Sequence, residues 1–391
     1  MAIFVYQAEE LYRWVTDKEN FVLLDVRNSK DFNRFRVEGP HSINTLNVSY
    51  FDFMEIEDEC VAQLPAKDTS IRIVCAKEGS AEFVAKILEK HGFSDVGYLA
   101  GGIKSWGNLL VPKLLNPGAA YELYQFIRPG KGSCSYGLAC NGEMILFDPS
   151  RNVDFYLAFA KEKGCRIVAT TETHLQADYI AGSKGVSDET AARFYANEID
   201  FKGAKLDYTV LKDGEDIGFG NGCPAVKVLF TPGHTPGSVM FLIDDAYLVS
   251  GDIIFIKSIG RPDLGGKVDE WSDELFKTIK KVSVMDGSLT ILPAHFIDWG
   301  EANTDLNFTE SLQKIREFNK SIYAISDSSE FLDFIKSNMR EQPPEYATIR
   351  MVNANLEQVD DEQAEILDLG KNECAASAYA ASQAEKNATT Q

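Results

Sequence analysis

The 391-residue sequence lacks the features that mark secreted, membrane-spanning and nucleic-acid-binding proteins. Its first residues, MAIFVYQAEELYRW, contain neither a basic segment nor a long apolar segment, so we expect no signal peptide. No apolar run approaches the roughly 20 residues that span a bilayer. Basic residues number 39 against 59 acidic ones, and the net charge of −20 would repel phosphate backbones and acidic membrane surfaces. We therefore expect no nucleic-acid partner and no membrane partner.

Cysteine pairs at metal-binding or redox spacing are also missing. The seven cysteines are odd in number and none forms a CxxC pair, which favours a reducing compartment over a disulfide framework. We therefore expect a cytoplasmic protein. Outside Cys75 we interpret the cysteines as structural, with a sulfur relay at the last of them left open: Cys60, Cys134, Cys140, Cys165, Cys223 and Cys374.

The length and the apolar patterning predict two domains with extensions. Residues 1–110 alternate short apolar runs with helical patterns, which indicates an α/β domain with a parallel sheet. Residues 111–118 contain two prolines and a glycine, which is typical of a linker. Residues 119–305 mix hairpins and helices, as in an α+β sandwich. We expect helices in 306–342, an irregular acidic segment in 343–370, and a disordered tail in 371–391.

Cys75 ends an apolar strand, and the residues AKEGS (76–80) lead into a predicted helix. Backbone N–H groups and the helix dipole at such a position stabilise a thiolate, and they could also bind an anionic persulfide. The alternative is a buried structural cysteine.

Four segments around this loop resemble the rhodanese family in order and spacing: LLDVRNSKDF (23–32), GPHSIN (39–44), CAKEGS (75–80) and GYLAGGIKSW (97–106). The resemblance implies that Cys75 is the nucleophile that carries a persulfide, with Asp25 and Arg27 in structural roles. Phosphatases of related fold need an arginine six places after the cysteine, where this chain has Ala81. The single Lys77 beside Glu78 makes thiosulfate a less suitable donor than a persulfide or polysulfide.

Only five histidines occur, and three of them stand where predicted strands end. His174 follows CRIVATTET, His234 lies in TPGHTPGS between two strands, and His295 ends LPAH. Asp252 follows a fourth strand in VSGD. Because imidazole and carboxylate groups bind transition metals and strand ends can converge, we expect a metal site from these residues.

This pattern resembles the metallo-β-lactamase superfamily, in particular its glyoxalase II and persulfide dioxygenase branches. The chain as a whole therefore resembles an α/β rhodanese-like domain followed by an α+β metallo-β-lactamase αββα sandwich with a helical C-terminal extension. The HxHxDH motif of the superfamily would place histidines at 176 and 179, but this sequence has Gln176 and Tyr179. A dinuclear zinc site would thus lack a ligand on each metal.

The remaining ligands, His174, His234 and Asp252, form a two-histidine, one-carboxylate set, which is the pattern of non-haem Fe(II) oxygenases. The resemblance implies one Fe(II) per chain at these positions, with zinc as the alternative metal. Asp178, Tyr179 and His295 are then neighbours of the ligands or of the substrate. Arg261, in GRPDL (260–264), is a candidate for holding an anionic substrate.

The leading hypothesis is a persulfide dioxygenase that oxidises a low-molecular-weight persulfide, such as glutathione persulfide, to sulfite with O2, coupled to sulfur transfer through Cys75. Two alternatives stay open: a glyoxalase II-like thioester hydrolase with one zinc, and a sulfur-carrier or persulfide-sensing protein. The acceptor thiol, the direction of sulfur flow and a homo-oligomeric state are left open.

Overall fold

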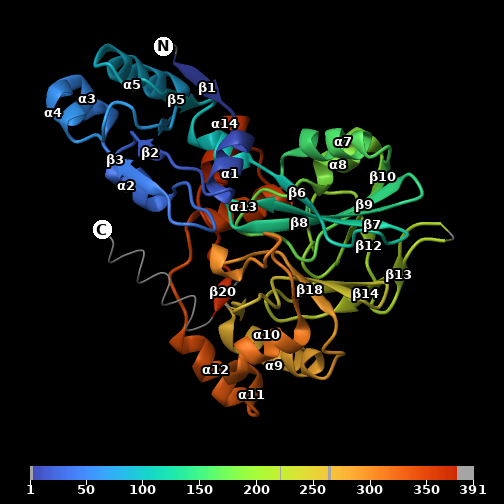
Figure 1. Cartoon of the computed structure of the whole chain (residues 1–391). Helices are drawn as coiled ribbons and strands as arrows, with labels where there is room; N and C mark the ends of the chain where they lie inside the picture. Colours follow the sequence, from blue (N-terminus) through green and yellow to red (C-terminus); the bar gives the residue numbers. More distant parts are fainter. Residues whose placement is uncertain (1–2, 221, 263–265, 377–391) are drawn as a thin grey trace.

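The computed structural model describes residues 3–220, 222–262 and 266–376. The first domain is a parallel five-stranded sheet in the order β1-β5-β4-β2-β3 with helices around it (Figure 1). Its central strands are buried on both faces, as in parallel sheets generally. The predicted α/β class is confirmed. Its elements are β1 (Phe4–Tyr6), α1 (Ala8–Thr16), β2 (Val22–Asp25), α2 (Ser29–Arg34), β3 (Asn44–Asn47), α3 (Tyr50–Glu55), α4 (Glu57–Ala62), β4 (Ile71–Val74), α5 (Glu78–Lys90), β5 (Val96–Leu99) and α6 (Ile103–Asn108).

The second domain begins with a seven-stranded sheet in the order β12-β11-β10-β9-β8-β7-β6, with α7 and α8 on one face (Figure 1). Residues 111–114, expected to lie in a linker, form β6 and pair antiparallel with β7. The polypeptide therefore passes from one domain to the other as a strand. The elements are β6 (Val111–Leu114), β7 (Glu122–Arg128), β8 (Ser133–Cys140), β9 (Glu143–Phe147), α7 (Val153–Glu162), β10 (Arg166–Thr171), α8 (Ser183–Thr190), β11 (Arg193–Ala196) and β12 (Thr209–Val210).

A six-stranded sheet in the order β13-β14-β15-β16-β18-β19 forms the other half of the sandwich, and α9 to α12 pack beyond it (Figure 1). Apolar side chains from both sheets share one core. The predicted αββα sandwich is confirmed. The elements are β13 (Asp216–Ile217), β14 (Val226–Phe230), β15 (Val239–Ile243), β16 (Tyr247–Gly251), β17 (Ile259–Gly260), α9 (Val268–Ser283), β18 (Thr290–Pro293), a 3₁₀ turn (Trp299–Glu301), β19 (Glu310–Ser311), α10 (Leu312–Phe318), α11 (Lys320–Ala324) and α12 (Ser328–Ser337).

The C-terminal segment differs from the expectation in two ways. Residues 343–370, expected to be irregular, contain α13 (Glu345–Asn353) and α14 (Asp361–Leu367), and Asp360 caps α14 together with Gln363. Residues 371–376, expected to be disordered, end in β20 (Ala375–Ala376), which pairs antiparallel with β17. Both segments are ordered by contacts with distant parts of the chain, which their local composition does not reveal. Residues 377–391 lie outside the described part of the chain.

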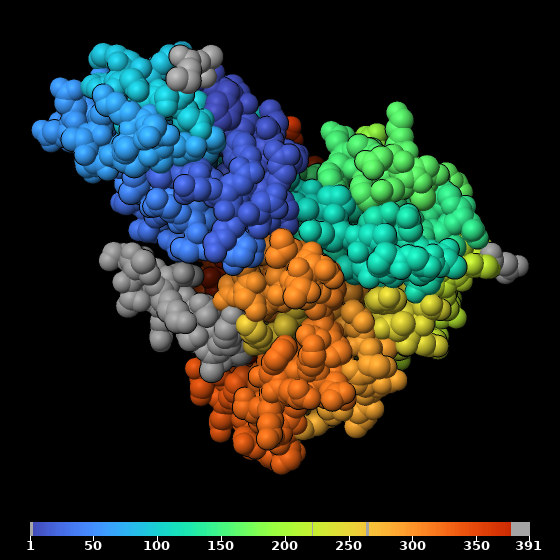
Figure 2. Space-filling model, in the orientation of Figure 1, coloured from blue at the N-terminus to red at the C-terminus, as the bar shows by residue number. Residues whose placement is uncertain are grey.

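The two domains pack directly against each other (Figure 2), and apolar side chains of both belong to one buried cluster. The Tyr12 and Trp299 rings lie 6.2 Å apart across the interface. At Gly130 a Cβ atom would fall 2.8 Å from the Gly107 Cα atom, so the close approach of the two backbones requires glycine. We infer that the two domains form a closely packed interface.

The sequence argued against disulfides, and this expectation is wrong for one pair of cysteines. Cys140 at the end of β8 and Cys223 before β14 form a disulfide across 83 positions of sequence. Their spacing matched no pattern, because the fold alone brings the end of β8 to this loop. In the described part of the chain, no helix has the length and apolarity that crossing a bilayer requires.

Candidate metal centre

His174, His234 and Asp252 meet at the edge of the sandwich where their strands end. His174 follows β10, His234 lies between β14 and β15, and Asp252 directly follows β16. Their candidate ligand atoms lie within 4.8 Å of one another, and each residue is at most 2% exposed. The structure therefore brings together the three residues that the sequence suggested as ligands.

His174 is oriented through its Nδ1 atom. The Thr173 hydroxyl donates to Asp148 over 2.8 Å, so its oxygen is available to accept from the Nδ1–H of His174, 3.0 Å away. The proton on Nδ1 leaves the Nε2 lone pair free to bind a metal. Burial lowers the pKa of His174 to about 3, which keeps the ring neutral.

His234 is oriented in the same manner by a backbone group. Its Nδ1 atom lies 2.8 Å from the carbonyl oxygen of Arg261, which can only accept a hydrogen bond. The neighbouring Gly260 must be glycine, since a Cβ atom there would fall 1.7 Å from the Asp252 carbonyl oxygen. The backbone at Gly260 and Arg261 therefore holds His234 in place.

Asp252 is held by His295, whose Nδ1 atom lies 2.6 Å from Asp252 Oδ1. On its other side His295 Nε2 is 2.9 Å from Asp178 Oδ2. Although burial opposes a charge on His295, the two carboxylates raise its pKa to about 10. Burial likewise opposes ionisation of Asp252, but His295 and the two ligand histidines hold its pKa well below the usual range. Asp252 is thus a carboxylate at neutral pH.

The orientation of the free ligand atoms fits a bound metal ion. Among the described residues, His234 Nε2 and Asp252 Oδ2 are buried without a hydrogen-bond partner, although they lie only 3.4 Å apart. Buried polar atoms without partners are costly in free energy. Two neutral imidazoles and a carboxylate suit a divalent transition metal. We conclude that these residues fit a single metal ion.

Gln176 and Tyr179 do not belong to this ligand cluster. The Gln176 side-chain amide donates to the Asp148 carboxylate over 3.2 Å, and the Tyr179 hydroxyl donates to the Asp148 carbonyl over 3.3 Å. Burial raises the pKa of Asp148 to about 6. Asp148 therefore organises the loop that carries His174. Sequence analysis assigned it no role, because a single aspartate after a strand carries no specific signal.

A second buried group lies beside the first and consists of Asp178, His295 and Cys374. Their candidate ligand atoms also lie within 4.8 Å of one another. Cys374 is 2% exposed and comes from the C-terminal segment. No sequence pattern placed this cysteine at the metal centre, and a disordered tail was expected there.

A cavity of about 360 Å³ reaches this group from the junction of the two domains. It is lined by Asp178, by Arg34 of the first domain, and by Lys131 and Lys371. Arg34 pairs with Glu345, and Lys371 pairs with Glu38. The carboxylates of Asp178, Glu345 and Glu373 also line the cavity, so cationic and acidic side chains balance one another beside the buried centre.

Arg261 is buried and holds the chain's own backbone. Its guanidinium donates to the carbonyl oxygens of Glu373 and Arg340, and its backbone N–H donates to the Cys374 carbonyl over 3.0 Å. These bonds fix the C-terminal segment beside the metal centre. Substrate binding by Arg261 stays a prediction.

Cys75 lies at the end of β4, before α5, as the sequence suggested. Burial raises the pKa of its thiol, while the Lys77 and Ala76 N–H groups and the Ser80 hydroxyl lower it by less. The expected thiolate-stabilising donors are therefore present but are outweighed by burial. Asp25 and Arg27 form a buried ion pair of 2.6 Å, which agrees with structural roles.

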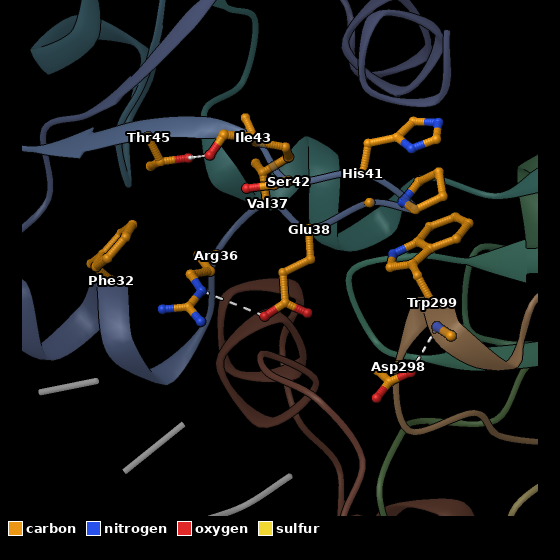
Figure 3. Close-up of a pocket in the computed structure, with 13 residues that line it drawn as sticks. Phe32, Arg36, Val37, Glu38, His41, Ser42, Ile43, Thr45, Asp298 and Trp299 are labelled. Atoms are coloured by element: carbon orange, nitrogen blue, oxygen red, sulfur yellow. Dashed lines mark hydrogen bonds and ion pairs between the residues drawn. The ribbon is translucent and has the colours of Figure 1, made fainter. Parts of the chain in front are cut away.

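A larger hollow of about 620 Å³ lies between the domains, away from these groups (Figure 3). His41 and Glu38 of the first domain face Trp299 and Asp298 of the second across it. The residues recorded along its wall include neither Cys75 nor the three candidate ligands. The wall of the smaller cavity includes Asp178, which contacts His295, so we place the access to the metal centre there.

Comparisons with known proteins agree with this geometry. Residues 7–109 match the model of the rhodanese-like domain, and residues 129–295 match that of the metallo-beta-lactamase superfamily. Human persulfide dioxygenase ETHE1, mitochondrial, is 30% identical over 183 residues, which cover 46% of this chain and 69% of that protein. The chain belongs to the metallo-β-lactamase superfamily. It carries a rhodanese-like domain in front of the superfamily domain.

Other members of the superfamily match as well. Hydroxyacylglutathione hydrolase of Francisella philomiragia is 26% identical over 222 residues, or 52% of this chain and 83% of that protein. A metallo-beta-lactamase structure from Staphylococcus aureus superposes with a TM-score of 0.54 at 28% identity, over 61% of this chain and 75% of that one. The relatives thus include an oxygenase and a hydrolase, and the ligand set must distinguish between them.

Proposed function

We propose that this protein is a persulfide dioxygenase with a sulfurtransferase domain. It would oxidise the terminal sulfur of a low-molecular-weight thiol persulfide to sulfite with O2. The observation that carries the proposal is the site itself: two histidines and one aspartate converge, while Gln176 and Tyr179 are turned to Asp148. Ferrous iron held by such a set would supply O2 chemistry, because three protein ligands leave coordination positions open.

The cavity beside the site contains cationic partners for a small anionic substrate. Arg34, Lys131 and Lys371 line it together with Asp178, Glu345 and Glu373, so the lining is balanced in charge although the net charge of the protein is −20. The Arg34 side chain comes from the first domain, so the same cavity adjoins both domains. Sulfur transfer through Cys75 would make or consume the persulfide, and its direction and the acceptor thiol stay open.

The deciding experiment is metal analysis of protein purified without oxygen, followed by oxygen uptake on addition of glutathione persulfide. We expect about one iron per chain and sulfite as the product. The Asp252→Asn variant should lose both metal and oxygen uptake, whereas Asp245→Asn, an exposed change in the turn before β16, should keep both. Full activity with zinc and no iron would contradict the proposal.

A hydrolase with a single zinc is the second candidate, since a hydroxyacylglutathione hydrolase is among the relatives. The same preparations should be assayed with a glutathione thioester. Hydrolysis that requires zinc, in the absence of oxygen uptake, would support this alternative. The cytoplasmic location stays a prediction.

A further inference from the structure

The C-terminal segment crosses the metal centre and is fixed there by several hydrogen bonds. The Asn372 side chain donates to the carbonyl oxygens of Gly132 and Phe296 over 2.9 and 3.2 Å. Two residues later, the Cys374 carbonyl accepts from Arg261, and β20 pairs with β17. The segment is therefore built into the site.

Cys374 is the residue that this segment brings to the centre. Its sulfur lies within 4.8 Å of the Asp178 and His295 ligand atoms. His295, a ring nitrogen of which lies within 4.8 Å of the Cys374 sulfur, also contacts the Asp252 carboxylate over 2.6 Å. The sulfur is thus one side chain, His295, away from the candidate ligand Asp252.

A second observation indicates that a ligand comes here. Among the described residues, Asp178 Oδ1 is buried and lacks a hydrogen-bond donor, whereas Asp178 Oδ2 is in ion-pair contact with His295. Asp178 and Glu373, which precedes the cysteine, both line the cavity of about 360 Å³. A small sulfur donor therefore has a route to the vicinity of the buried thiol.

We propose that Cys374 carries the sulfane sulfur at the metal centre, so that the persulfide oxidised is a cysteine persulfide of this chain. This inference rests on the proposed function and names its immediate substrate. A persulfide would extend the side chain by one S–S bond of about 2 Å. The added sulfur would lie in the buried group of Cys374, Asp178 and His295, which adjoins the candidate ligand Asp252 through His295.

The steps balance in atoms and electrons. First, the Cys374 thiol attacks the outer sulfur of a donor R–S–SH: the donor S–S bond breaks, a new S–S bond forms on Cys374, and R–SH leaves with the proton. Then Cys374–S–SH, O2 and H2O give Cys374–SH and sulfurous acid, which ionises to sulfite. The outer sulfur loses four electrons and O2 gains four. The thiol is regenerated for the next donor.

The test uses the full-length iron-loaded protein and a single turnover. Without oxygen, the protein is treated with glutathione persulfide, desalted, and divided. One portion is alkylated and digested, and mass spectrometry determines whether the Cys374 peptide carries an extra sulfur. The other portion receives oxygenated buffer, and sulfite is counted per chain. Cys75→Ser is included because Cys75 could store sulfur as well, and Cys165→Ser controls for labelling of an accessible thiol.

We expect extra sulfur on Cys374 in the wild type, Cys75→Ser and Cys165→Ser proteins, and about one sulfite per chain in the wild type and Cys165→Ser proteins. Cys374→Ser should give no sulfite after desalting, with iron content and melting temperature unchanged; Cys374→Ala serves if the serine variant does not fold. Oxygen uptake by Cys374→Ser on free glutathione persulfide at the wild-type rate would overturn this inference and leave the proposed function intact. Absence of oxygen uptake in every protein, with sulfur still on Cys374, would overturn both.

Discussion

The ionisation of a buried carboxyl group in this protein depends on whether a partner compensates its burial. Asp252 is surrounded by imidazoles and stays ionised, whereas Glu301 accepts a hydrogen bond from the Ile297 N–H and, among the described residues, its second oxygen is buried without a hydrogen-bond partner. Burial therefore raises the pKa of Glu301 to about 7. The ionisation of Glu301 is therefore shifted to higher pH, and that of Asp252 to lower pH.

Glu301 gives a prediction for stability. Because its pKa is raised in the folded state, its contribution is fully present below pH 4.5 and is lost as the pH rises toward 7. The difference corresponds to about 3 kcal/mol. The Glu301→Gln variant does not titrate, so its free energy of unfolding should rise relative to wild type by up to that amount between pH 4.5 and 8. Urea unfolding at several pH values measures this, and a constant difference would contradict the assignment.

Cys75 gives a prediction for the first domain. Cys75→Ser should abolish sulfur transfer from a persulfide donor to cyanide, because the nucleophile is removed. Metal content and oxygen uptake should remain at wild-type values, since the metal ligands all come from the second domain. Cys60→Ser, which also replaces a buried thiol of this domain, should keep sulfur transfer. Transfer that survives in Cys75→Ser would assign the nucleophile elsewhere.

At the scale of elements, the C-terminal helices position the metal-binding loop. Asn353 at the end of α13 donates to the carbonyl oxygens of Gln176 and Tyr179 over 3.0 and 2.9 Å, and accepts from the Ala181 N–H over 2.9 Å. One side chain thus satisfies three backbone groups of the loop that follows His174. Such supporting contacts commonly influence metal affinity.

The Asn353→Ala variant should therefore bind metal about tenfold more weakly, because the loop loses these three hydrogen bonds. Competition with a chelator measures the affinity. Met351→Ala changes an exposed side chain of the same helix and should leave the affinity unchanged. Equal affinities in the two variants would show that the loop is held by its own contacts.

At the scale of the whole molecule, Asp368 connects the domains. It is buried and pairs with Arg128 at 2.6 Å, and it accepts from the Ile180 N–H over 3.2 Å. Arg128 in turn donates to the Gly107 carbonyl of the first domain over 2.7 Å. The C-terminal segment, the sandwich and the first domain therefore meet at one charged group.

Replacing Asp368 by alanine leaves Arg128 buried without its counter-charge, which should cost about 3–5 kcal/mol. Thermal unfolding should shift to lower temperature and separate into two transitions, as the first domain loses its link to the sandwich. Glu362→Ala, at an exposed position of α14, the helix that ends directly before Asp368, should unfold like the wild type. Calorimetry distinguishes the two results, and one unshifted transition would rule out this role.

The sequence by itself determined the local elements and the types of ligand. Short apolar runs specify buried strands such as β2 and β4, and His174, His234 and Asp252 stand at strand ends because turns tolerate polar side chains. Gln176 and Tyr179 were also informative, since a missing imidazole is visible without a structure. These features depend on neighbouring residues or on residue identity alone.

Only the tertiary structure decided which distant groups touch. The Cys140–Cys223 disulfide, the role of Asp148, the strand in residues 111–114 and the placement of Cys374 beside Asp178 all join segments far apart in sequence or depend on such packing. A polar C-terminal segment predicts disorder when it is considered alone. Here residues 372–376 are ordered because hydrogen bonds to Gly132, Arg261 and β17 compensate the loss of backbone entropy.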